Sequence, residues 1–272
     1  MVDKRSIKAA LNARSSHFLS FSLHIYDSVT STNQVLWQLM QEGMLAGTVV
    51  IATQQTAGRG QWGRQWVSSQ GGLYLSVAIA PNIEARDSYL LTFATAWGIT
   101  QQLRDLNIPV EIKWPNDLVL NKLKLGGILT ETKISHGKIT QAVIGVGINY
   151  SNPVPTTGIN MESWLVGATK ALPQTIYSIE ILAEKVLLGI ESGIECLSQD
   201  GVDVLLPKYT SLLTNIGERV YLENVSGTVV GVTSTGCLHV RTLNFDSKSV
   251  NIPDLFLPPG TISLGYRNSQ KL

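Results

Sequence analysis

Charged residues, cysteines and long apolar runs are all scarce in this chain of 272 residues. Only 15% of the residues are charged, against about 25% in an average globular domain, whereas 44% are hydrophobic. A disordered chain has too little apolar content to offset the entropy lost on ordering, so this composition excludes disorder. The length suits one large domain, or one large and one small.

Cysteine occurs only as Cys196 and Cys237. Two cysteines are too few for a disulfide framework, and neither lies in the Cys-x-x-Cys or His-rich spacing of a metal site. We interpret both as inert buried thiols.

Neither sign of charge dominates, because 21 Lys and Arg residues face 20 Asp and Glu residues. A net charge of +1 provides no global field for nucleic acid or anionic lipid, so any basic site is local. No apolar run approaches the roughly 20 residues that cross a bilayer, and the first residues lack an apolar signal core. We therefore expect a soluble, cytoplasmic protein with no membrane partner.

Two hydrophobic periods alternate along most of the chain. Residues 49–53, 73–79 and 110–114 have strand-like patterns, and residues 92–106 and 178–197 have helical spacing. More strand-like runs follow at 118–120, 128–134 and 139–148, joined by the turns Asn121-Lys122 and His136-Gly137. Helices interspersed with a hairpin-rich sheet predict an α+β fold with a mixed, mainly antiparallel sheet, and not a doubly wound parallel one.

The chain divides into three parts. Residues 1–20 are too few for a domain and predict a tail or a short helix. Residues 21–215 hold the long helices and the main sheet, and form the main predicted domain. Beyond them the helical period ends and short strand-like runs begin, which predicts a small β barrel over residues 216–272.

Residues 54–66 combine glycines, two arginines and two tryptophans. Gly58, Gly60 and Gly63 free the backbone to turn N–H groups toward an anion, and arginines add fixed donors. Large aromatics in a loop usually cover something flat, which favours a phosphate or carboxylate clamp over an ordinary solvated loop. The segment is neither a Walker phosphate loop nor a Rossmann fingerprint.

Three other segments gather polar groups. Pro115 ends a strand, so residues 113–117 present their polar side chains at its rim. Lys124 precedes paired glycines, which leaves its ammonium beside exposed backbone. Ser31 and Gln34 have the spacing of a capping box, and the adjoining hydroxyl and amide suit a small polar head group. The alternative explanations are an ordinary turn for residues 113–117, the start of an ordinary strand after Lys124, and a helix cap at Ser31.

Six motifs occur in a fixed order: Asp27-Ser28-Val29-Thr30-Ser31-Thr32-Asn33, Gln55-Thr56-Ala57-Gly58-Arg59-Gly60, Gly72-Leu73-Tyr74-Leu75-Ser76, Lys113-Trp114-Pro115-Asn116-Asp117, Lys124-Leu125-Gly126-Gly127-Ile128-Leu129 and Gly145-Val146-Gly147-Ile148-Asn149. This series resembles the biotin protein ligases. The resemblance implies a catalytic domain like that of class II aminoacyl-tRNA synthetases and a C-terminal SH3-like barrel. It also implies an ATP-dependent enzyme that makes biotinyl-5′-AMP and biotinylates a lysine of a carrier domain, such as that of acetyl-CoA carboxylase.

The resemblance assigns roles to individual residues. The implied biotin site consists of Ser31, Thr32, Asn33, Gln55, Gly58, Arg59, Gly60, Gln61, Lys124 and Gly127. The implied nucleotide site consists of Lys113, Asn116, Asn149, Trp66 and Arg64. Its implied catalytic residues are Lys124, Arg59 and Asp117, and Mg²⁺ is placed near Asn116 and Asp117 without defined ligands. Some relatives have arginine in place of Gln61, so retention of the adenylate rests more on Arg59 and Arg64.

Bifunctional relatives carry an N-terminal helix-turn-helix domain. The residues before Leu23 leave no room for one in this sequence, so we expect a monofunctional ligase without specific DNA binding. A homodimer formed through a sheet edge stays open. Two alternative functions also stay open: a lipoate or octanoate ligase or transferase of similar fold, and a nonenzymatic biotin or nucleotide sensor.

Overall fold

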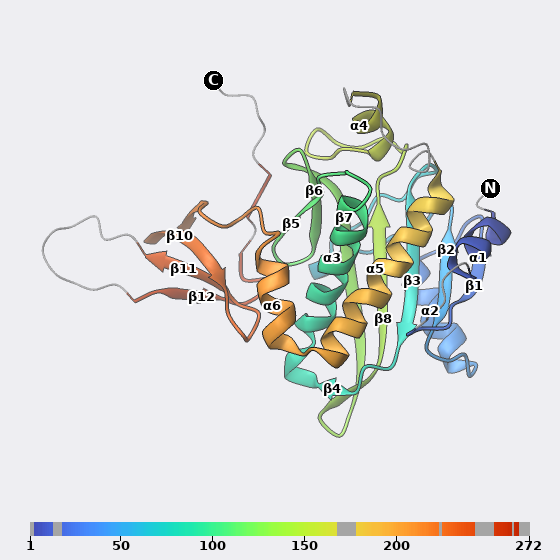
Figure 1. Cartoon of the computed structure of the whole chain (residues 1–272), viewed down its shortest axis with the longest axis horizontal. Coiled ribbons are helices and arrows are strands. Elements are labelled where there is room, and N and C mark those ends of the chain that lie inside the picture. The colour runs from blue at the N-terminus through green and yellow to red at the C-terminus, as the bar shows by residue number, and fades with distance from the viewer. Residues whose placement is uncertain are drawn as a thin grey trace, which may run out of the picture.

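The structure, a computed structural model, describes residues 3–12, 18–167, 178–222, 225–242, 253–262 and 264–266. A large sheet with helices on both faces forms the main body, and a second, smaller sheet lies at its side (Figure 1). Parts of the predicted N-terminal tail and of the predicted barrel lie outside the described residues.

The large sheet has eight strands and confirms the predicted mixed, mainly antiparallel arrangement. Seven strands run in the order β1-β2-β3-β8-β7-β6-β5, β4 pairs with β8, and only β1 and β2 are parallel. The strands are β1 (Ser22–Tyr26), β2 (Thr48–Ala52), β3 (Leu73–Ile79), β4 (Ile83–Glu84), β5 (Glu111–Lys113), β6 (Asp117–Leu120), β7 (Leu123–Ser135) and β8 (Lys138–Ile148). Both predicted hairpin turns occur, with positive φ at Asn121, Lys122, His136 and Gly137, as two-residue hairpin turns require.

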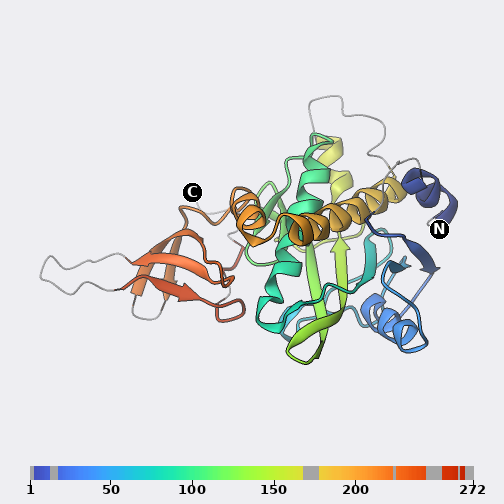
Figure 2. The same ribbon diagram turned by 60° about the horizontal axis from the view of Figure 1, so that its bottom comes forward.

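Helices α3 and α5 lie side by side across one face of this sheet, and α2 packs on the opposite face (Figures 1 and 2). The helices are α1 (Lys4–Asn12), α2 (Thr32–Gln41), α3 (Tyr89–Arg104), α4 (Met161–Gly167), α5 (Ile179–Gln199) and α6 (Val202–Thr210). Sequence periodicity predicted α3 and α5. It did not predict α4, which is short, or α6, which contains Pro207.

Alternate residues of each strand serve the two faces. Val49, Ile51 and Val77 are buried in the large core beneath α3 and α5, whereas Val50 and Ala78 belong to a small cluster beneath α2. Burying an aliphatic side chain of this size contributes about 1.5–3 kcal/mol, so the α3 and α5 side dominates stability. The face of the sheet under α2 carries the smaller apolar cluster, so a ligand site on that face displaces less apolar packing.

The predicted capping box at the start of α2 is wrong. Ser31 is the N-cap residue, with extended backbone, but its side chain makes no capping bond. The Gln34 side chain instead accepts a hydrogen bond from Thr30 Oγ1 at 3.2 Å. The Ser31 hydroxyl is therefore available to the cavity described below.

The smaller sheet is antiparallel, in the order β12-β11-β10-β9. Its strands are β9 (Arg219–Leu222), β10 (Val225–Val232), β11 (Leu238–Thr242) and β12 (Leu255–Leu257). Trp114 joins it to the main body, because its indole Nε1 donates to the Gly236 carbonyl at 3.2 Å. Of the two free thiols, Cys196 is buried and Cys237 is half-buried.

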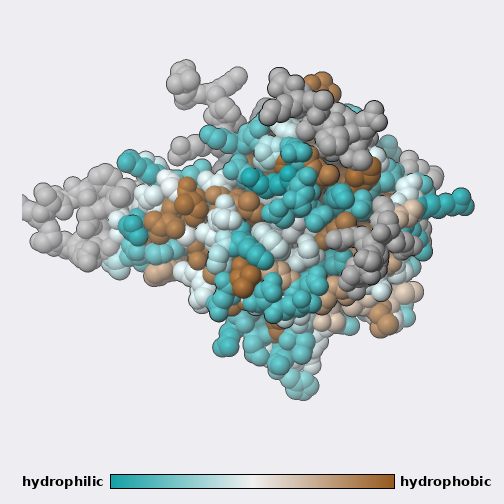
Figure 3. All heavy atoms as spheres, in the orientation of Figure 1, coloured by the Kyte–Doolittle hydropathy of each residue, from teal (hydrophilic) through white to brown (hydrophobic). Residues whose placement is uncertain are grey.

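On the face drawn in Figure 3, apolar side chains form small groups among hydrophilic ones. Within the described residues, we find no helix with the length and apolar character needed to cross a membrane.

Candidate active site

A cavity of about 460 Å³ lies beside the N-terminus of α2. Fourteen of the sixteen residues predicted from the sequence line it: Ser31, Thr32, Asn33, Gln55, Arg59, Gly60, Gln61, Arg64, Trp66, Lys113, Asn116, Asp117, Lys124 and Gly127. Its volume lies in the range of about 300–1,000 Å³ that is usual for small-molecule sites. The structure therefore brings together residues that stand almost 100 positions apart in the sequence.

The sheet supplies the floor of this cavity through glycines. Gly127 and Gly147 are paired across β7 and β8, and Gly145 follows at the next position on the same face. A Cβ atom at Gly145 would overlap Asn33 Oδ1, and one at Gly147 would lie 2.6 Å from Trp66 Nε1. On this one face of the sheet, Gly145 thus makes room for Asn33 of α2, and Gly147 makes room for Trp66.

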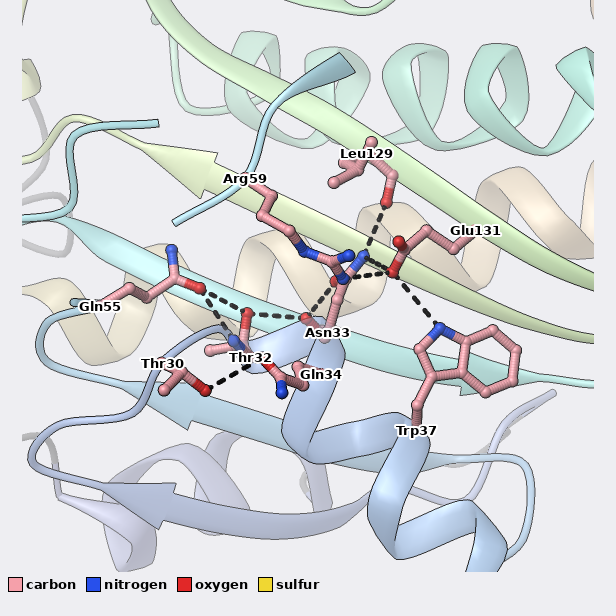
Figure 4. Close-up of polar contacts among 10 residues, drawn as sticks. Thr30, Thr32, Asn33, Gln34, Trp37, Gln55, Arg59, Leu129 and Glu131 are labelled. Carbon is pink, nitrogen blue, oxygen red and sulfur yellow. Dashed lines mark hydrogen bonds and ion pairs between the residues drawn. The ribbon is translucent and has the colours of Figure 1, made fainter. Parts of the chain in front are cut away.

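Neutral hydrogen-bonding groups line the end of the cavity next to α2, which we call the neutral end (Figure 4). Gln55 Oε1 accepts from the Thr32 backbone N–H at 2.8 Å, and its Nε2 donates to Ser68 Oγ at 2.8 Å. Ser76 Oγ, on β3, lies 2.6 Å from Asn33 Oδ1 and 2.8 Å from Thr32 Oγ1. Both amide groups are therefore held in fixed orientations before any ligand binds.

Sequence reasoning missed Glu131 and Ser76. Glu131 accepts a hydrogen bond from Asn33 Nδ2 at 2.9 Å. In the sequence it reads as one polar residue in an alternating strand. The available signal was the period of two, because Glu131 and Leu129 follow Gly127 on the same face of β7.

Cations gather at the other end of the cavity, which we call the charged end. Lys124 Nζ lies 2.7 Å from Asp117 Oδ1, with 30% of the lysine side chain and 16% of the aspartate side chain exposed. The two residues are brought together because β6 and β7 are neighbours. Lys124 Nζ also lies 5.3 Å from the centroid of the Trp66 ring, within cation–π range.

Lys113 adds a second ammonium group at the charged end. Burial lowers the pKa of Lys113, against the opposing effect of the carboxylates of Asp117 and Glu218. Its Nζ donates to the Gly265 carbonyl and lies 3.6 Å from the centroid of the Tyr266 ring. Sequence patterns could not predict that residues 264–266 lie here, since they are about 150 positions from Lys113.

Two predicted site residues do not line the cavity. Gly58 begins the loop of residues 58–66 and packs against the other end of that loop, where a Cβ would overlap Ser68 Oγ and the Trp66 carbonyl oxygen. Asn149 is buried, and its Nδ2 lies 3.4 Å from the Lys124 carbonyl. Asn149 thus holds the backbone of Lys124 in place from outside the cavity.

Asn116 and Asp117, near which the resemblance implies Mg²⁺, already have hydrogen-bond partners within the protein. Among the described residues that line the cavity, Asp117 is the acidic one, and its second oxygen accepts a hydrogen bond from the Tyr266 hydroxyl at 2.6 Å. Asn116 Nδ2 donates to the Ile128 carbonyl at 2.9 Å. Across the part of the chain that the structure describes, no three His, Cys, Asp or Glu side chains cluster as metal ligands.

Known proteins are similar to this chain over the region that contains the site. Residues 25–149, which contain most of the cavity lining, match the family described as "Biotin/lipoate A/B protein ligase family". The bifunctional ligase/repressor BirA of Escherichia coli (strain K12) is 30% identical over 227 residues, which are 80% of this chain and 68% of that protein. BirA of Bacillus subtilis (strain 168) is 27% identical over 223 residues, again 80% of this chain and 68% of that protein.

A solved structure shares the fold. The biotin protein ligase from Aquifex aeolicus in complex with biotin and ATP matches with a TM-score of 0.65 and 26% identity. The match covers 81% of this chain and 92% of that one. Fold and site together define this chain as an enzyme of the protein-ligase class. It belongs to the biotin/lipoate A/B protein ligase family.

Proposed function

We propose that the chain is an ATP-dependent biotin protein ligase. In the first step a biotin carboxylate oxygen attacks the α-phosphorus of ATP, which forms biotinyl-5′-AMP and releases pyrophosphate. In the second step a lysine amine of a carrier domain attacks the acyl carbon, and AMP leaves with the bonding electron pair. The observation that carries this proposal is a single cavity with a neutral end and a charged end.

The neutral end suits the biotin head group, whose fused ring carries uncharged N–H and C=O groups. Ser31, Thr32 and Asn33 on or beside the first turn of α2 supply donors and acceptors, and Gln55 faces them from the next loop. Gly127 leaves space for the ring, and Trp66 flanks the ligand on the nucleotide side. Because these side chains are already oriented, biotin binding costs little free energy for ordering them.

The charged end suits the reacting groups. Negative charge moves onto phosphate oxygens in the first step and onto the AMP leaving group in the second, so fixed cations lower both barriers. Lys124 is placed to contact the biotin carboxylate and the α-phosphate, with Lys113 and Asn116 on the nucleotide side. Asp117 has its carboxylate placed to orient the incoming lysine amine. In the structure the Asp117 carboxylate forms an ion pair with Lys124.

The loop of residues 58–66 would cover the bound intermediate. Arg59, Gly60, Gln61 and Arg64 line the cavity from this loop. Retention matters because the mixed anhydride reacts with any exposed amine. In this proposal Mg²⁺ arrives bound to ATP.

The finer organisation belongs to the same proposal. Residues 21–215 would form the catalytic domain, related in fold to class II aminoacyl-tRNA synthetases, and residues 216–272 an SH3-like barrel. The partner would be a biotin carboxyl carrier domain, in the cytoplasm. The chain would bind neither specific DNA nor membranes.

A direct assay tests the proposal. The purified protein is incubated with ATP, Mg²⁺ and labelled biotin, with and without a biotin carrier domain, and carrier labelling and pyrophosphate are both measured. We expect biotin-dependent pyrophosphate release and labelling of a single carrier lysine. The matched control replaces biotin with octanoate. Transfer of octanoate in preference to biotin would contradict the proposal, and binding of biotin without turnover would indicate a sensor.

A further inference from the structure

Glu131 gathers hydrogen-bond donors from two separate segments at one oxygen atom. Besides Asn33, its Oε2 accepts from Trp37 Nε1 at 3.3 Å and lies 2.9 Å from Arg59 Nη2 (Figure 4). Glu131 itself does not line the cavity, whereas Asn33 and Arg59 do. Any effect of Glu131 on a ligand therefore passes through these neighbours.

The first segment is α2. Asn33 and Trp37 are four residues apart, so they lie on one face of this helix and can reach the same carboxylate. Lys133, two residues after Glu131 on β7, places its Nζ 4.8 Å from the centroid of the Trp37 ring. The indole is thus held by a hydrogen bond at its edge and by a cation at its face, which fixes α2 against β7.

The second segment is the loop of residues 58–66. Arg59 is the residue of this loop that forms an ion pair, and 47% of its side chain is exposed. At the far end of the loop, the Trp66 carbonyl accepts a hydrogen bond from Ser68 Oγ at 3.0 Å. Ser68 is two residues beyond Trp66, so that bond is local, and the Arg59–Glu131 ion pair is what attaches the loop to β7.

We propose that Glu131 is a positioning residue that holds this loop over the neutral end through Arg59. By doing so it sets how long biotin and biotinyl-5′-AMP remain bound. This inference rests on the proposed function. It differs from a role in which Arg59 binds phosphate directly, because the Arg59 guanidinium is turned toward Glu131 and its charge is balanced there.

Two variants separate these roles. Glu131→Gln keeps the side-chain length and an oxygen acceptor for Asn33 and Trp37, but removes the charge that pairs with Arg59. Arg59→Met removes the guanidinium from a half-exposed loop side chain, so it cannot disturb the core. Glu84→Gln is the matched control, since Glu84 is an exposed glutamate on β4 of the same sheet.

The readouts are the dissociation rate of labelled biotin, measured by a chase with unlabelled biotin, and the KM values for biotin and ATP. We expect Glu131→Gln to release biotin about fivefold faster, the upper end for a partly exposed ion pair. Arg59→Met should match it, and the double variant should be no faster than either single one. The KM for biotin should rise with the release rate while the KM for ATP stays within about twofold.

The outcomes are distinguishable. Wild-type protein that forms no biotinyl-5′-AMP would contradict the proposed function. Wild-type protein that forms it, together with a Glu131→Gln variant that releases biotin at the wild-type rate, would overturn the role of Glu131. Additive effects in the double variant would show that Arg59 acts on the ligand independently, which would also overturn it.

Discussion

The neutral and charged ends of the cavity differ in how their polar groups are satisfied. At the neutral end, the side chains of Thr32, Asn33 and Gln55 already have partners within the protein. At the charged end, Lys113 and Lys124 both line the cavity, and Lys124 is the one that forms an ion pair with Asp117, so cationic groups face the cavity there. A prearranged neutral network favours recognition with little reorganisation, whereas uncompensated charge favours anionic groups that arrive with the substrates.

This difference divides the work between the two ends. Changes at the neutral end should act on biotin binding and on the lifetime of bound species. Changes at the charged end should act on the chemical step.

Lys124→Ala should reduce adenylate formation by about 100-fold or more, because removing one donor at a developing charge typically costs about 3–4 kcal/mol. The fold should be unaffected, since the Lys124 side chain is 30% exposed. Pyrophosphate release with biotin and ATP is the measurement. Activity within tenfold of wild type would show that Lys124 is not the main cation at the reacting centre.

Gly145→Ala should raise the KM for biotin about tenfold with a smaller change in kcat. The new Cβ would overlap Asn33 Oδ1, and overpacking of this kind costs about 1–3 kcal/mol. Gly231→Ala is the matched control, because a Cβ at this strand glycine meets nothing within 4 Å. An unchanged KM for biotin would place the head group elsewhere.

The sequence predicted the charged end and the neutral end with similar success, because motifs are local. Ser31 to Asn33 are consecutive, and Lys113 to Asp117 span five positions. The pairing of Lys124 with Asp117 could not be predicted, since it depends on the register of β6 against β7. The role of Glu131 was missed because it also depends on tertiary contacts. Only the packing of α2 against β7 shows which groups face its carboxylate.

The fold shows the same limit. Long periodic segments such as α3 and α5 were predicted, as was the hairpin-rich sheet. The capping box at Ser31 failed because Thr30 hydrogen-bonds to the Gln34 side chain. Helix α6 was missed because Pro207 normally interrupts a helix, and here the surrounding packing overrides that preference.

Arg59→Gly should increase the escape of biotinyl-5′-AMP about threefold to fivefold without preventing its formation. This range follows from the loss of one partly exposed ion pair and the freer backbone of glycine. The escaped anhydride acylates bystander lysines, so labelling of serum albumin reports the leak at equal adenylate production. If albumin labelling does not rise, the loop of residues 58–66 does not retain the intermediate.

Tyr74→Phe should alter stability and leave catalysis almost unchanged. Tyr74 is buried on β3, two residues before Ser76 on the same face, and its hydroxyl donates to the Ser69 carbonyl at 2.7 Å. Its loss should cost about 1 kcal/mol at pH 8. Burial also raises the pKa of Tyr74 from its ordinary value of 10 to about 12.

The sign of the pH effect on Tyr74 follows from that shift. Between pH 10 and about 12 the unfolded tyrosine has lost its proton and the folded one has not, so wild-type stability falls across this window. Tyr74→Phe has no hydroxyl to lose a proton at this position, so its stability does not fall for this reason. The difference in unfolding free energy between wild type and Tyr74→Phe should therefore narrow as the pH rises. Urea unfolding at pH 8 and pH 11 measures it, and a constant gap would refute the assignment.

The most direct test of the division between the two ends is biotin binding by Lys124→Ala, measured by calorimetry without ATP. We expect this variant to bind biotin within about tenfold of the wild-type affinity, although it forms almost no biotinyl-5′-AMP when ATP is added. Gly145→Ala should show the reverse pattern, with weakened binding and an adenylate-forming rate close to wild type at saturating biotin. Loss of biotin binding in Lys124→Ala, with normal binding in Gly145→Ala, would contradict the account.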